Sequence, residues 1–252
     1  MTLTNIGSVH DRLDETELAL TFYNQALPIQ HAVSDRNGEA VTLNNIGSVH
    51  WRLGDTEQAL TFYNQALPIR RDIGDRDGEA ATLNNIGSVH DSLGDTQQAL
   101  TFYNQALPIL RGNGEATTLN NIGLVHWRLG DTQQALAFFN QALPIQRGIG
   151  DRRGEATTLT NIGSVHYNLG DTQQALTFYN QALPIRRAVG DRSGEAATLN
   201  NIGSAHWRLG DTQHALTFFN QALPITRAIG DRNGEAVTLN NIGLVHQPPR
   251  RH

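Results

Sequence analysis

The sequence contains no cysteine and no lysine, and all 19 of its basic side chains are arginines. Without cysteine the chain can form no disulfide and has no thiolate for catalysis or metal binding. It carries 24 acidic side chains, which gives a formal net charge of −5. Because nucleic acid binding depends on clustered basic side chains, this balance predicts no nucleic acid partner.

Long hydrophobic segments are also missing. No apolar run approaches the roughly 18 residues that a membrane-spanning helix needs. The first ten residues, MTLTNIGSVH, hold no basic segment followed by an apolar stretch, as a signal peptide would. We therefore expect no membrane partner and a soluble, cytoplasmic protein.

What the sequence does contain is one unit repeated from end to end. The isoleucine of an Asn-Ile-Gly triplet recurs every 40 residues, with one interval of 36, at Ile6, Ile46, Ile86, Ile122, Ile162, Ile202 and Ile242. A fixed period of this length is typical of repeats that stack on their neighbours. The chain is thus expected to form an elongated array rather than a domain with one central core.

Residues 42–81 represent the unit, and their pattern predicts two helices. At 100° per residue, the apolar side chains of the first half share one face with Gly47 and His50: Leu43, Ile46 and Leu53. Gly54 stands where a helix ends in a left-handed residue, and Asp55 is placed to cap the next helix. The inner face of that second helix holds Ala59, Phe62, Tyr63, Ala66, Leu67 and Ile69.

These residues resemble the tetratricopeptide repeat in its 40-residue form, which occurs in G-protein regulator scaffolds and in bacterial signalling-associated arrays. The signature positions are held here by Leu43, Ile46, Gly47, Ala59, Tyr63 and Ala66, and residues 74–80, GDRDGEA, resemble the linker of the long form. The match departs from the family at His50, where a tyrosine or another large residue is usual, and at Pro68 inside the second helix. The resemblance implies an all-α, right-handed solenoid of helix-turn-helix repeats.

On this basis residues 2–246 are expected to form a single array, followed by a disordered tail at 247–252. The predicted repeats are 2–41, 42–81, 82–117, 118–157, 158–197 and 198–237, with a half repeat at 238–246. Repeat 82–117 lacks four residues, about one helical turn, so its second helix should be shorter. The recurring prolines should face solvent and kink the second helix rather than break it; they are Pro28, Pro68, Pro108, Pro144, Pro184 and Pro224.

Three patterns suggest chemistry, but each has a simpler interpretation. A histidine recurs in every repeat, as at His50, yet stacked helices lie about 8–10 Å apart and zinc bonds are near 2 Å, so we expect these histidines to pack in the core. Ser48 and His50 face different sides of a helix and do not form a catalytic pair. The acidic residues around Asp75 are expected to cap a helix rather than bind calcium. We therefore predict no enzyme activity, no cofactor and no metal.

The polar face of the first helix is the expected binding surface. One amide recurs there in each repeat, and a tryptophan-arginine pair follows it in three repeats. The candidate peptide-binding residues are Asn45, Asn85, Asn121, Asn161, Asn201, Trp51, Arg52, Trp127, Arg128, Trp207 and Arg208. An amide both donates and accepts, so a ladder of amides can hold an extended peptide main chain. Hydrogen bonding between repeats is the alternative for the asparagines, and packing on the next repeat is the alternative for the tryptophans.

The function that follows is a non-catalytic scaffold that binds a peptide or protein segment in the groove that this helix lines in the tetratricopeptide family. Two alternatives stay open: a structural spacer, or the repeat fragment of a larger signalling protein. The last helix keeps the apolar residues of an internal repeat, including Leu239 and Ile242. Since an uncovered apolar face often marks a contact, head-to-tail self-association is also expected.

Overall fold

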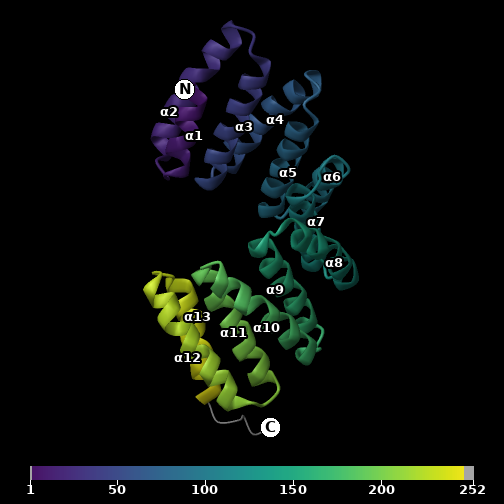
Figure 1. Cartoon of the computed structure of the whole chain (residues 1–252), viewed down its shortest axis with the longest axis vertical. Helices are drawn as coiled ribbons and strands as arrows, with labels where there is room; N and C mark the ends of the chain where they lie inside the picture. The colour runs from purple at the N-terminus through teal and green to yellow at the C-terminus, as the bar shows by residue number, and fades with distance from the viewer. Residues whose placement is uncertain (1, 247–252) are drawn as a thin grey trace. The chain divides into compact units, whose positions relative to one another are not determined.

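The computed structural model describes residues 2–246, and within them the chain forms thirteen α-helices and no strand. The expected tail at 247–252 lies outside the described residues. The helices, drawn in Figure 1, are α1 (Leu3–Arg12), α2 (Thr16–Ala32), α3 (Arg36–Arg52), α4 (Thr56–Asp72), α5 (Arg76–Ser92), α6 (Thr96–Ala106), α7 (Asn113–Arg128), α8 (Thr132–Ile149), α9 (Arg152–Asn168), α10 (Thr172–Ala188), α11 (Arg192–Arg208), α12 (Thr212–Ala228) and α13 (Arg232–His246). We call the odd-numbered helices the A helices and the even-numbered helices the B helices. The all-α repeat solenoid predicted from the sequence is confirmed.

The helices fall into two compact units that meet at Val125 and His126, inside α7. In each unit an A helix packs against the B helix that follows it, and that B helix packs against the next A helix. Figure 1 shows these neighbours running as antiparallel hairpins within a unit. A single continuous array stays a prediction.

The A helices begin earlier than the sequence suggested. The Asp75 carboxylate accepts a hydrogen bond from the Gly78 backbone N–H at 3.0 Å, so Asp75 is the N-cap of α5 and the helix starts at Arg76. The segment that resembles a linker therefore forms the first turn of an A helix. The expected repeat boundary at Thr82 falls inside that helix, whereas the capping role expected of Asp75 is observed.

The core of a hairpin is one aromatic ring packed among small residues. Tyr63 is buried between Ala59 and Ala66 on α4 and lies against Gly47 of α3. A Cβ added to Gly47 would be only 2.7 Å from the Tyr63 ring, closer than such atoms normally approach. Glycine is thus required by the close approach of the two helices, as the family signature implied.

The recurring prolines are exposed, as expected, and five of the six lie inside continuous B helices. The exception is Pro108. Its helix α6 ends at Ala106, because the four missing residues remove its last turn, and the chain turns through Gly112 at a φ of +61°. The shorter second helix predicted for this repeat is confirmed.

Successive hairpins are joined by a shared carboxylate. Glu79 on α5 accepts from Arg71 Nε of the preceding α4 at 2.9 Å and from Arg76 of its own helix at 2.7 Å. The same three-residue arrangement recurs at Glu155, Glu195 and Glu235. At Glu39 the preceding helix supplies His31 instead of arginine.

Candidate interaction surface

The A helices form the more closely spaced layer in each unit. Helix α3 contacts both α1 and α5, and α11 contacts both α9 and α13. Within the described residues of either unit, the B helices lie farther apart and touch through side chains, as where Arg71 on α4 donates to Gln105 Oε1 on α6 at 3.5 Å. The A helices therefore lie on the inner side of each stack, where the family resemblance placed the groove.

Two of the predicted asparagines bond to the preceding repeat. Asn45 Nδ2 donates to Ser8 Oγ at 3.4 Å, and Asn85 Nδ2 donates to Asn44 Oδ1 at 3.3 Å. Asn121 also reaches the preceding repeat: burial raises the pKa of Tyr103, and hydrogen bonding of Tyr103 with Ser88 and Asn121 opposes that rise. Inter-repeat hydrogen bonding, one of the two alternatives, is thus present along the ladder. Asn161 and Asn201 are half-buried on the same face.

A second ladder was missed by the sequence reasoning. The asparagine before Asn45, Asn85 and Asn201 bonds to a buried threonine of the next repeat, as in Asn84 Oδ1 with Thr118 Oγ1 at 2.8 Å and Asn200 Nδ2 with Thr238 Oγ1 at 2.8 Å. The signal was available, because the threonine recurs with the same period. These pairs lock neighbouring A helices in register.

The tryptophan-arginine pairs are also engaged between repeats. Trp51 is half-buried against a core cluster that includes Leu83 and Ile86 of the next repeat. Arg52 forms an ion pair with Asp11 of the preceding repeat. Packing on the next repeat, the alternative for the tryptophans, is therefore observed for Trp51.

The pair in the sixth repeat is more open. The Trp207 residue is 43% exposed, and Arg208 donates to the Tyr167 carbonyl oxygen at 2.5 Å while its guanidinium lies 4.8 Å from the centre of the Tyr167 ring. In the fourth repeat Trp127 is half-buried and Arg128 is exposed. Of the predicted aromatic anchors, Trp207 is the most accessible.

A small pocket lies between α11 and α13, with a volume of about 200 Å³. Its lining includes Asn200, the predicted Asn201, Thr226 and the N-cap residue Asp231. Asn200 is 8% exposed, and its Oδ1 atom has no hydrogen-bond partner. The lining thus combines two amide side chains with the carboxylate of Asp231.

The pocket exists because Thr226 is short. Two other B helices carry arginine at this position, and two carry glutamine. Arg186 bonds to the cap residue Asp191 and donates to Thr157 Oγ1 at 3.1 Å. Arg70 pairs with Asp75 in the same way. The Thr226 hydroxyl instead donates to the Leu223 carbonyl oxygen at 2.9 Å and does not fill the space.

The recurring histidines pack as expected, but at the hairpin edge rather than in the core. His50 stacks on Phe62 of the same hairpin with 5.5 Å between ring centres, and its side chain is 21% exposed. Its Nδ1 atom lies 3.4 Å from Asp55 Oδ2. The sequence reasoning missed this carboxylate, although an acidic residue follows each histidine of the first six repeats by five positions.

Comparison with known proteins agrees with this geometry. The family model of the tetratricopeptide repeat matches residues 1–72, 38–112, 114–188, 154–228 and 194–247. The chain therefore belongs to the tetratricopeptide repeat family. No curated protein matches it significantly in sequence.

Solved structures show the same fold at low sequence identity. BtubC from P. vanneervenii is 21% identical, with a TM-score of 0.70 over 100% of this chain and 96% of BtubC. A signal transduction ATPase with numerous domains (STAND) and a tetratricopeptide repeat sensor, from Pyrococcus horikoshii, is 13% identical with a TM-score of 0.83; the match covers 96% of this chain but 38% of the ATPase. A Rap protein solved in complex with competence and sporulation factor is 15% identical with a TM-score of 0.68, over 96% of this chain and 73% of Rap.

The fold and the family are those of a protein-interaction repeat scaffold. None of the helices within residues 2–246 combines the length and the hydrophobicity needed to span a bilayer.

Proposed function

We propose that the chain is a non-catalytic scaffold that binds an extended peptide or protein segment along its A helices. We further propose that the pocket between α11 and α13 receives a basic side chain of that segment. The observation that carries the proposal is this pocket, which places Asn201 of the ladder beside the buried acceptor Asn200 Oδ1 and the carboxylate of Asp231.

The contacts of arginine in another repeat indicate how a ligand side chain would bind in the pocket. Where Arg186 is present, its guanidinium lies over Gly194 and bonds to Asp191, and the equivalent residues Gly234 and Asp231 line the pocket. A guanidinium is planar and carries five N–H donors, which suits a site of acceptors. An arginine side chain from a partner would therefore make the ion pair with Asp231 in the sixth repeat that Arg70 and Arg186 make with the cap residues of the second and fifth repeats.

Features around the pocket favour a peptide rather than a small molecule. Trp207 and Arg208 lie on the same helix α11 as Asn201, and tryptophan and arginine are frequent anchors at protein interfaces. The Rap protein with the same fold is solved in complex with competence and sporulation factor.

The test fills the pocket from within. Thr226→Arg gives the sixth repeat the residue found at Arg70 and Arg186, and the new guanidinium should pair with Asp231. Random peptides are selected on the parent protein, and their affinity for both proteins is measured by calorimetry. We expect selection of arginine-containing peptides that bind Thr226→Arg at least about 10-fold more weakly, since each 1.4 kcal/mol changes affinity tenfold.

Thr226→Val is the matched control, because it keeps the shape of the side chain and leaves the pocket open. It should bind the peptides within about twofold of the parent. Peptides that bind parent and Thr226→Arg equally would exclude the pocket, whereas a selection that yields no peptide at all would count against the scaffold function itself.

End-to-end self-association is a second candidate, favoured by the exposed face of α13. Leu239 is 44% exposed and Val237 is 54% exposed, whereas Leu199, at the position equivalent to Leu239 in α11, is fully buried. A contact between unlike ends of two copies would cover this face without closing a ring. Light scattering over a dilution series tests it: the mass should rise with concentration in the parent and fall to that of a monomer in Leu239→Asn.

A further inference from the structure

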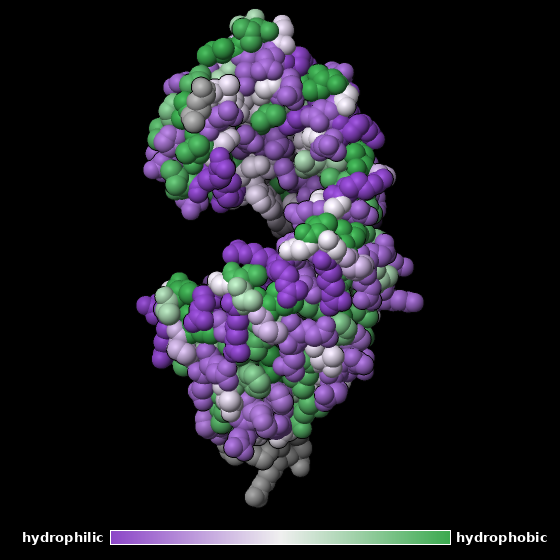
Figure 2. Space-filling view, in the orientation of Figure 1, coloured by the Kyte–Doolittle hydropathy of each residue, from purple (hydrophilic) through white to green (hydrophobic). Residues whose placement is uncertain are grey.

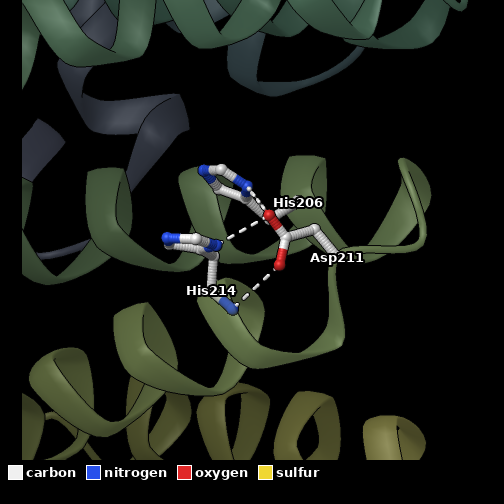
Figure 3. Close-up of side chains that lie close together, drawn as sticks. All are labelled: His206, Asp211 and His214. Atoms are coloured by element: carbon white, nitrogen blue, oxygen red, sulfur yellow. Dashed lines mark hydrogen bonds and ion pairs between the residues drawn. The ribbon is translucent and has the colours of Figure 1, made fainter.

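One side-chain cluster on α11 and α12 is not used by the proposed function. His206, at the end of α11, and His214, in the first turn of α12, both direct Nδ1 at the Oδ2 atom of Asp211 (Figure 3). The distances to Oδ2 are 3.3 Å for His206 and 2.7 Å for His214. One ligand atom from each residue lies within 4.8 Å of the others.

The cluster is unique to the sixth repeat among the described hairpins. The histidine-carboxylate pair recurs in the first six repeats, but the position of His214 holds leucine or glutamine in the others: Leu18, Gln58, Gln98, Gln134 and Gln174. His214 is thus the residue that distinguishes the sixth repeat from the others at this position.

Each of the three residues is partly held in place. Asp211 caps α12 by accepting from the His214 backbone N–H at 3.2 Å, which fixes one carboxylate oxygen and leaves the other toward the imidazoles. The His206 ring stacks on Phe218 with 5.4 Å between centres, and the His214 ring stacks on His206 at 5.2 Å. Little further ordering is needed to bring the donors together.

We propose that His206, Asp211 and His214 bind one divalent transition metal ion, specifically Zn²⁺. Two imidazole nitrogens and one carboxylate oxygen form a ligand set typical of zinc. Around a tetrahedral ion with bonds of about 2.0–2.1 Å, ligand atoms lie roughly 3.3 Å apart, which matches the separation of His206 Nδ1 from Asp211 Oδ2. His214 Nδ1, now at a hydrogen-bond distance of 2.7 Å, moves away from Oδ2 by about 0.6 Å to admit the ion. The side chains of His214 and Asp211 are 64% and 39% exposed, so an ion can enter and water can fill the open position.

The bound ion would join the two helices of one hairpin. His206 belongs to the A helix, while Asp211 and His214 belong to the turn and the B helix. Zinc therefore cross-links α11 to α12 and stabilises the folded hairpin by binding it in preference to the unfolded chain.

Zinc chloride is the probe, titrated into metal-free full-length protein by calorimetry. We expect one ion per chain at this site and a rise in Tm on zinc addition. His214→Gln installs the residue found in four other repeats, so it should fold normally. Because it removes a ligand, it should weaken zinc binding at least about 10-fold and abolish the rise in Tm. Equal zinc affinity in parent and His214→Gln, or no zinc binding by the parent, would overturn the proposal.

The matched gain-of-site variant is Gln58→His on α4. His50 Nδ1 already lies 3.4 Å from Asp55 Oδ2, and Asp55 caps α4 by accepting from the Gln58 backbone N–H at 3.2 Å, so the substitution recreates the ligand set in the second repeat. We expect a second zinc ion per chain with an affinity similar to the first. A stoichiometry that stays at one would show that this geometry does not make a zinc site.

Discussion

The hydroxyl group of Tyr63 donates a hydrogen bond to Ser48 Oγ over 3.1 Å, which links α4 to α3 inside the hairpin core. The same pair recurs in the first, third and fifth hairpins. In the fourth hairpin both members change together, to Leu124 and Phe139. Burial raises the pKa of Tyr63, and the bond from Ser48 opposes that rise.

This relationship predicts that Tyr63→Phe compensates for the loss of stability caused by Ser48→Leu. Ser48→Leu alone should lower the free energy of unfolding by about 1–3 kcal/mol, since it leaves the buried Tyr63 hydroxyl without its partner. Adding Tyr63→Phe removes that hydroxyl and recreates the Leu124 and Phe139 pair, so most of the loss should be recovered. Urea denaturation of the four proteins in the cycle measures the coupling. Additive losses would contradict the pairing.

Glycine at the helix crossing should be intolerant of even one methyl group. A Cβ at Gly87 would lie 2.7 Å from the Tyr103 ring, so Gly87→Ala should destabilise the chain by about 1–3 kcal/mol despite the better helix propensity of alanine. Gly148 on α8 is the control, because an added Cβ there meets nothing within 4 Å. Gly148→Ala should raise the urea midpoint. Similar effects of the two substitutions would argue against the close packing of α5 and α6.

Ala66 provides a separate test of packing on the B helix. It is fully buried beside Leu43 and Ile69, so Ala66→Leu should cost about 1–3 kcal/mol through overpacking. The exposed neighbour Gln65 is the control, and Gln65→Leu should change the melting temperature little. Equal melting curves for parent and Ala66→Leu would show that the helix face is assigned wrongly.

The N-cap of α5 predicts a loss of stability in acid. The backbone hydrogen bond from Gly78, together with Arg70, lowers the pKa of Asp75 below its ordinary value of 3.8. A carboxyl whose folded pKa is lowered stabilises the fold above its unfolded pKa, and this stabilisation is lost as the pH falls through the folded pKa. Asp75→Ala should therefore lower the urea midpoint at neutral pH by an amount equivalent to about 0.5–2 kcal/mol. The deficit should shrink as the pH falls below 3.8, and a deficit independent of pH would contradict the charge contribution.

The sequence was sufficient for the parts of the fold that depend on periodicity. Most of each inner face, the exposed prolines and the shortened helix α6 follow from residues spaced at helical intervals within one repeat. Leu53 was wrongly placed on the inner face: it is the C-cap residue of α3 and is 56% exposed, because the helix ends before it. The start of the A helices did not follow: the capping role of Asp75 was expected, but the segment around Gly78 has the composition of a loop, and only the backbone shows that it is already helical. Local composition cannot separate a linker from a capped first turn.

The candidate site was harder to predict, because its properties arise between repeats. Asn45 was correctly placed on the polar face, but its bond to Ser8 depends on how two A helices are spaced. The pocket forms because the short Thr226 side chain does not extend to Asp231, which lies beyond the turn that follows α12. Figure 2 shows a surface in which hydrophobic groups are scattered among hydrophilic residues, so no single patch marks the site on the face drawn.

The carboxylates shared between hairpins have a consequence for the order of unfolding. Glu79 joins α5 to Arg71 of α4, so separating those two helices would leave its nearly buried carboxylate without the arginine partner. At the junction of α6 and α7 the arrangement is missing: Arg111 donates to the carbonyl oxygens of Pro108 and Leu110, and no arginine pairs with Glu115 among the residues that the structure describes. Under tension or in denaturant, the first unit should separate at this junction before any other, so this unit has a weak point where the repeat period is interrupted.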